Sequence, residues 1–118
     1  MSLGDVAKWV SKDARYKIIE VLVSTRSART LASQLGVSHT VINKYLKRKT
    51  HPSDETLARA LNIVEEYERK RVLQILVEDI LEALTILVNE IKDSGDKDLL
   101  EYISSKLISV LEAIKEDE

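Results

Sequence analysis

The chain has 118 residues, with 18 Lys and Arg, 20 Asp and Glu, two histidines and no cysteine. This length makes one domain, or one small domain with a helical appendage, and the missing cysteine excludes a disulfide framework, a thiolate metal site and a thiol nucleophile. One proline, three glycines and no phenylalanine, among many Leu, Ile, Val, Glu and Lys, predict an all-α fold.

The two halves of the chain differ in charge. Residues 1–52 hold ten Lys and Arg against three acids, a net charge of +7, whereas residues 53–118 hold eight basic and seventeen acidic side chains, a net charge of −9. A basic half of this kind fits a polyanionic partner. The alternative is an uneven surface charge that has no functional meaning.

The basic half begins with two predicted helices. Residues 3–10 form a short helix, and Trp9 is expected to pack it onto the rest of the domain. Ser11 can cap a second helix, which ends in the polar segment STRS at 24–27. Apolar residues repeat at helical spacing in that second helix at Ala14, Ile18, Val21 and Leu22.

Two more short helices follow, joined by very few residues. Ser27 caps ARTLASQL, Gly36 ends that helix, and Ser38 caps HTVINKYLKR. A turn this tight needs a left-handed backbone, which costs a residue with a Cβ roughly 1 kcal/mol or more. Ala32 supplies the small residue required where the helices touch. The apolar positions that hold the pair together are Leu31, Leu35, Val37, Ile42 and Tyr45.

These two helices resemble the helix-turn-helix family of the Cro and phage-repressor type, also called Xre-like. The resemblance covers about residues 14–63 and is strongest in LASQLGVSHTVINKYLKRKTHPSDETLARAL. The matching positions are LA at 31–32, GVS at 36–38, Ile42, and Pro52-Ser53 leading into a helix with Leu57. The resemblance implies a helix-turn-helix domain that binds double-stranded DNA and reads the major groove with the helix 38–48.

Two positions depart from the family pattern. The usual Gln at the start of the first motif helix is Ala28, so the backbone or base contact that this Gln makes in the family does not carry over to this sequence from the resemblance. The frequent Gly after the recognition helix is Arg48, which predicts a different exit from that helix and an added charge for phosphate.

The outer face of the helix 38–48 carries the candidate DNA contacts. Asn can bond adenine bidentately and Lys can reach guanine, so Asn43 and Lys44 are predicted to read bases. His39 and Thr40, at the helix start, are predicted to contact bases or phosphate. The residues predicted to hold the phosphate backbone are Arg26, Arg29, Ser38, Lys47, Arg48 and Lys49. The alternative is a polar face that is only solvated.

Ser53 can cap a further helix. From Asp54 no helix breaker occurs before Ser94, which predicts a single helix of about 39 residues. Its middle, EEYERKR at 65–71, has no apolar residue but Tyr67 and is predicted to be a solvated helical connector supported by i,i+4 ion pairs. DSGDK at 93–97 then makes a tight turn into a last helix that runs to about Lys115.

The C-terminal hairpin carries an excess of apolar residues. Residues 72–91 hold thirteen apolar side chains in twenty, far more than one partner helix covers. A two-fold dimer, in which two hairpins form a four-helix bundle, would bury that excess. The predicted interface residues are Leu76, Ile80, Leu84, Leu87, Ile91, Ile103, Leu107 and Leu111. The alternative is that this surface folds back onto the N-terminal domain.

The predicted organisation is a helix-turn-helix domain over 1–64, a charged connector over 65–71 and a dimerising hairpin over 72–118. We expect a homodimeric transcriptional regulator that binds specific sequences of double-stranded DNA. It would not be an enzyme, and we expect no catalytic, metal or cofactor site and no small-molecule ligand. Two alternatives are the DNA-targeting module of a larger mobile-element protein such as a recombinase, and a helical protein-interaction adaptor without DNA binding.

The sequence also bears on location. Apolar runs such as VLQILV and ALTILV are interrupted by acids well before the roughly 20 residues that a membrane span needs. No secretory signal is visible at the N-terminus, so we expect a cytoplasmic protein without a membrane partner. Scarce Asn and Gln beside abundant Lys, Glu and Arg are features shared with thermophile proteins.

Overall fold

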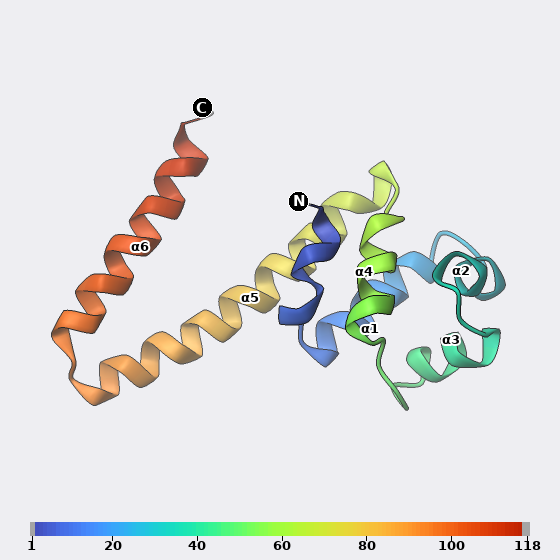
Figure 1. Cartoon of the computed structure of the whole chain (residues 1–118), viewed down its shortest axis with the longest axis horizontal. Helices are drawn as coiled ribbons and strands as arrows, with labels where there is room; N and C mark the ends of the chain where they lie inside the picture. Colours follow the sequence, from blue (N-terminus) through green and yellow to red (C-terminus); the bar gives the residue numbers. More distant parts are fainter. Residues whose placement is uncertain (1, 117–118) are drawn as a thin grey trace. The chain divides into compact units, whose positions relative to one another are not determined.

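A computed structural model describes residues 2–116 of the chain. Within these residues the chain forms seven helices and no strand, which confirms the predicted all-α class. The helices are the 3-10 helix η1 (Leu3–Trp9), α1 (Lys12–Val23), α2 (Ala28–Leu35), α3 (His39–Leu46), α4 (Asp54–Asn62), α5 (Glu66–Ser94) and α6 (Lys97–Lys115) (Figure 1). The chain divides into two compact units, Met1–Ile80 and Leu81–Glu118, and the boundary between them lies within α5.

The first unit has one hydrophobic core to which η1, α1 to α4 and the first part of α5 all contribute. Its largest fully buried apolar side chains, each with no exposed surface, are Ile18, Ile19, Leu22, Leu31, Leu35, Ile42, Leu57 and Val72. Truncating such a side chain to alanine typically costs about 2 to 5 kcal/mol. This core is therefore what fixes the short helices relative to one another.

Local signals set the helix boundaries. In each of α1 to α4 a serine hydroxyl at the N-cap accepts a hydrogen bond from a backbone N–H in the first turn, as the sequence predicted. These serines are Ser11, Ser27, Ser38 and Ser53. A cap of this kind contributes about 1 kcal/mol. Gly36 ends α2 with a left-handed φ of 69°, which confirms its predicted role.

A buried guanidinium joins three segments of the first unit. Arg15 is 6% exposed, and its Nε donates to the Val10 carbonyl at 2.9 Å. Its other nitrogens donate to the carbonyls of Pro52 and Ala7 and to the carboxylate of Asp54, at 2.9, 3.0 and 2.7 Å. A buried charge is tolerated only when its donors are paired. Arg15 therefore ties η1 and the start of α4 to α1.

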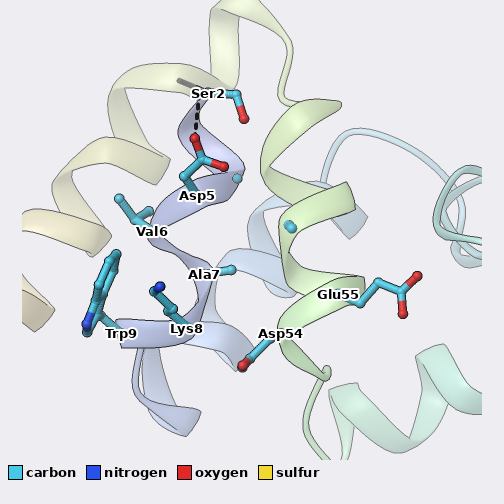
Figure 2. Close-up of a pocket in the computed structure, with 10 residues that line it drawn as sticks. Ser2, Asp5, Val6, Ala7, Lys8, Trp9, Asp54 and Glu55 are labelled. Atoms are coloured by element: carbon cyan, nitrogen blue, oxygen red, sulfur yellow. Dashed lines mark hydrogen bonds between the residues drawn. The ribbon is translucent and has the colours of Figure 1, made fainter.

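Trp9 does not pack into the domain as expected, because its side chain is 65% exposed. η1 is a 3-10 helix, in which every third residue shares a face, and the positions that turn inward are Gly4, Ala7 and Val10. Trp9 is left on the rim of a hollow between η1 and α4, with the Lys8 ammonium 4.5 Å from its ring centre (Figure 2).

The single helix expected from Asp54 to Ser94 is wrong, because the chain breaks between α4 and α5. α4 ends at Asn62, and the backbone N–H of Glu65 donates to the Glu68 carboxylate at 2.9 Å. A glutamate in the third position of a new helix that bonds back to the N-cap is one half of a capping box. The acid run therefore starts a second helix instead of extending the first.

The charged segment 65–71 is not a solvated connector throughout, because Glu68 is only 3% exposed. Three residues of α5 that follow it lie in the core of the first unit: Val72, Ile75 and Leu76. Asp79 adds a polar anchor by accepting hydrogen bonds from the backbone N–H of Ser11 at 2.9 Å and from its hydroxyl at 2.5 Å. The first unit consequently extends to Ile80, well past the expected boundary at residue 64.

The second unit contains the end of α5, a turn and α6. Gly95 has a φ of 74°, and the Asp96 carboxylate accepts a hydrogen bond from the Leu99 backbone N–H at 3.0 Å, which confirms the predicted turn. No residue from 81 to 116 is buried, and α6 leads away from the end of α5 in Figure 1. Among the described residues, no helix is long and apolar enough to span a membrane.

Candidate functional site

The candidate site is built on α2, α3 and the three residues between them. The backbone N–H of Val37 donates to the Ala32 carbonyl at 3.0 Å, so the turn closes on the last residues of α2. α3 is held against the core by Ile42 and Tyr45, which are 0% and 5% exposed. Burial raises the pKa of Tyr45, which a hydrogen bond with Thr56 partly offsets. The inner side of α3 is thus fixed to the first unit.

The outer side of α3 carries the predicted base-reading residues. His39, Thr40 and Lys44 are exposed, and Asn43 is half-buried. Asn43 follows His39 by four residues and Thr40 by three, and Lys44 follows Thr40 by four, so these side chains lie on the same side of the helix. Ser38 precedes them and caps α3 by accepting a hydrogen bond from the Val41 backbone N–H at 3.1 Å. Its hydroxyl is therefore engaged, and the remaining N–H groups of the first turn are those that can meet an anion.

Exposed cations surround this face. Arg29 lies on α2, Lys44 on α3, and Lys47 and Lys49 follow α3, all of them exposed. None of these four makes an ion pair within the part of the chain that the structure describes. Their charges are available to an external anion, and the phosphate contacts of Arg29, Lys47 and Lys49 stay predictions.

Arg26 cannot serve as the predicted phosphate contact, because its side chain is only 8% exposed. It pairs with Glu68 at 2.5 Å and donates to Gln34 at 3.0 Å. Burial alone would raise the pKa of Glu68, but hydrogen bonds from Thr25 and the Glu65 backbone and the Arg26 charge hold it below its usual value. Arg26 therefore joins the α1–α2 connection to the start of α5.

Arg48 is also engaged within the first unit. It donates to Asp13 at 2.9 Å, lies 3.6 Å from a carboxylate oxygen of Glu20, and covers the Tyr16 ring at 5.1 Å from its centre. Hydrogen bonds from Lys17 and Arg48 lower the pKa of Asp13, and the bond to Asp13 raises the pKa of Arg48. The predicted phosphate role of Arg48 is thus at odds with its contacts, because two acids already occupy its guanidinium.

The predicted dimer residues lie in different environments. Leu76 is 4% exposed in the core of the first unit, so it is not available to a second chain as expected. Ile80, Leu87, Leu107 and Leu111 are exposed, at 43%, 55%, 37% and 54% of their surface. Three others are half-buried: Leu84, Ile91 and Ile103. The predicted interface residues that have accessible surface therefore all follow Leu76 in the sequence.

Sequence reasoning missed the acids that occupy Arg26 and Arg48. Glu68 lies 42 residues from Arg26, and Asp13 lies 35 residues from Arg48, so no local pattern connects them. The i,i+4 pair of Asp13 with Lys17, at 3.0 Å, is the one local sign that this acid is engaged. Comparison of the chain with protein-family models, with curated proteins and with solved structures found no match.

Proposed function

We propose that the chain binds specific sequences of double-stranded DNA, with α2 and α3 as a helix-turn-helix and α3 as the recognition helix. The observation that carries this proposal is the two-sided character of α3. One side is fixed in the core by Ile42 and Tyr45, while the other presents exposed hydrogen-bonding side chains. The cations around them make no ion pair with any residue from 2 to 116. A rigid surface whose positive charges are not neutralised suits a polyanion, and its hydrogen-bonding side chains suit one that exposes base edges, as double-stranded DNA does.

The contacts follow from the dimensions of the major groove. The groove is about 12 Å wide and admits one α-helix with its side chains. With α3 in it, Asn43 can bond an adenine bidentately and Lys44 can reach guanine. His39 and Thr40, at the helix start, meet bases or the adjacent phosphate. Arg29, Lys47 and Lys49 hold the backbone on either side and fix the register without reading sequence.

We also propose that two copies act together as a homodimeric transcriptional regulator. Residues 81–116 contain no buried side chain, yet they hold many of the exposed large apolar residues of the chain. Exposed apolar surface of this extent marks an association site. A four-helix bundle made of two hairpins would supply the missing core. The exposed apolar residues of α5 at 77, 80 and 87 recur at near-heptad spacing, which suits helix pairing.

The test is selection of bound sequences from a random duplex library, with the mass of the bound complex measured by light scattering. We expect a palindromic consensus bound by two chains, with half-site centres about 34 Å apart or a multiple of that. Unselective binding, or none by a folded protein, would refute the proposal and favour a helical adaptor. A consensus without two-fold symmetry, bound by one chain, would support the proposed DNA binding and refute the proposed dimer.

A further inference from the structure

α3 ends in an unusual backbone conformation. The N–H of Arg48 donates to the Tyr45 carbonyl at 3.0 Å, and the N–H of Lys49 donates to the Lys44 carbonyl at 2.9 Å. This pair of bonds is a Schellman motif, which needs a left-handed residue and usually takes glycine. α2 ends in the same way with Gly36. At the end of α3 the residue is Arg48, with a φ of 57°, the one described residue other than glycine with a positive φ.

An arginine in this conformation carries strain that a glycine would not have, so its side chain must contribute something in return. Asp13, Tyr16 and Glu20 lie at i, i+3 and i+7 and therefore share one face of α1. The Arg48 guanidinium meets all three, through a hydrogen bond, a ring contact and a second ion pair. We call these four residues the Arg48 cluster.

We propose that Arg48 is a positioning residue, which fixes the C-terminal end of α3 to α1 and thereby sharpens discrimination between DNA sequences instead of binding phosphate. The inference rests on the proposed DNA binding. The N-terminal end of α3 is already fixed by the turn at Gly36, and the Arg48 cluster fixes the other end. With both ends held, Asn43 and Lys44 meet the base edges in one orientation, which bidentate readout requires.

Electrostatics argue against a phosphate at this position. A phosphate that approached Arg48 would also approach the carboxylates of Asp13 and Glu20, which lie 2.9 and 3.6 Å from its nitrogens. Two like charges at that range offset the attraction of one guanidinium. Arg48 is 47% exposed, and ion pairs this exposed contribute little to folding. Its effect should therefore appear in DNA discrimination and in the local order of α3, and hardly in global stability.

Two variants break the cluster from opposite sides. Arg48→Gly removes the guanidinium and suits the left-handed backbone, so it should fold normally. Asp13→Asn with Glu20→Gln removes both acids and leaves Arg48 in place. The matched control is Glu66→Gln with Glu78→Gln, which removes two exposed acids of the first unit that make no ion pair among the described residues. For each protein, dissociation constants are measured for the selected duplex and a random duplex over a range of salt concentrations.

We expect Arg48→Gly to weaken binding of the selected duplex about fivefold or more, the low end for one lost bidentate base contact. Random-duplex affinity and its salt dependence should stay unchanged. The Asp13/Glu20 variant should lose the same discrimination. The slope of its log association constant against log salt concentration should steepen by up to about 0.9, because Arg48 becomes free to meet a phosphate. The control should keep the wild-type ratio. Equal weakening of both duplexes by Arg48→Gly, with a slope smaller by about 0.9, would overturn the inference in favour of a phosphate contact.

Amide hydrogen exchange separates this inference from the proposed function. Both cluster variants should exchange the Lys47 and Lys49 amides several-fold faster than the wild type and the control do, with or without DNA. Unchanged exchange would refute the positioning role even if the protein binds DNA. If neither the wild type nor any variant binds a duplex, the proposed function and the claim about sequence discrimination both fail. The exchange data still decide whether Arg48 fixes the end of α3.

Discussion

Asn43 and the lysines around it make different contributions if α3 enters the major groove. Asn43 is half-buried on α3, whereas Lys49 is exposed and follows the helix. Asn43→Ala should cost about 1 to 3 kcal/mol of binding free energy and relax the preference at one base position. Library selection on the variant checks this. Equal losses on selected and random duplexes would contradict a base-reading role.

Lys49→Ala is the matched comparison for Asn43→Ala. A lysine that contacts phosphate carries no sequence information, so its loss should weaken all duplexes alike and reduce the salt slope by about 0.9. Titrations of selected and random duplexes at several salt concentrations give both quantities. A change confined to the selected duplex would move Lys49 from backbone binding to base readout.

Gly36 tests the turn itself, independently of DNA. Its φ of 69° is unfavourable for any residue with a Cβ, and that Cβ would also lie 3.4 Å from the Arg59 guanidinium. Gly36→Ala should therefore destabilise the protein by about 1 kcal/mol or more. For a domain of this size that lowers Tm by roughly 4 to 8 °C. Gly36→Asn, which tolerates the left-handed region better, should lose less, and an alanine variant as stable as wild type would contradict the argument.

At the scale of the elements, the sequence predicted well whatever depends on neighbouring residues. The serine caps, Gly36 and the turn at Gly95 are local signals, and each occurs where it was expected. The break before α5 was missed because Glu68 needs partners in the α1–α2 connection as well as a local one. Trp9 was misplaced because the three-residue repeat of η1, and not the usual helical spacing, decides which of its residues turn inward.

The same distinction applies to the candidate site. The exposed face of α3 could be predicted, because helical spacing alone separates its residues from Ile42 and Tyr45. The availability of a cation could not be predicted, because it depends on which acid lies opposite in the fold. Arg29 and Lys49 have no such neighbour among the described residues, whereas Arg48 does. Charge counting in sequence therefore overstates the number of phosphate contacts.

The Arg26–Glu68 pair is a contact between elements whose strength depends on pH. Because the pKa of Glu68 in the folded chain lies below its ordinary 4.5, the carboxylate adds stability above that pH. This stability is lost as pH falls below 4.5 through the folded value. Glu68→Gln should reduce stability at neutral pH by about 3 kcal/mol, as expected when one partner of a buried ion pair is removed.

Thermal unfolding between pH 3 and 7 measures the effect of Glu68→Gln, and the wild-type and variant curves should converge toward the acid end. Asp13→Asn serves as the comparison, because Asp13 is an exposed acid with a lowered pKa and its pairs are screened by water. If the difference between wild type and Glu68→Gln stayed constant across this range, the proposed linkage would be wrong.

At the scale of the whole molecule, the two units differ in what holds them together. The first has a core drawn from six helices and anchored to α5 by Glu68 and Asp79. The second has no buried residue between 81 and 116. Isolated helices of α6 length are marginal in water, because most helical stability comes from packing an apolar face. We therefore expect the second unit to depend on a partner surface, which the proposed dimer would supply, whereas the first unit has its own core.

A chain ending at Ile80 tests this dependence. It should fold cooperatively as a monomer with a Tm independent of concentration. The Tm of the full chain should rise with concentration, because the proposed dimer would stabilise the folded state by mass action. Leu87→Glu with Leu111→Glu is the full-length control, since both side chains are more than half exposed and their charges should separate the copies without touching the first core. Both proteins should bind a palindromic duplex about a hundredfold more weakly than the wild type, because linked binding to two half-sites is lost. A full chain that stays monomeric at every concentration would show that the apolar face of the second unit is covered in some other way than by a second copy.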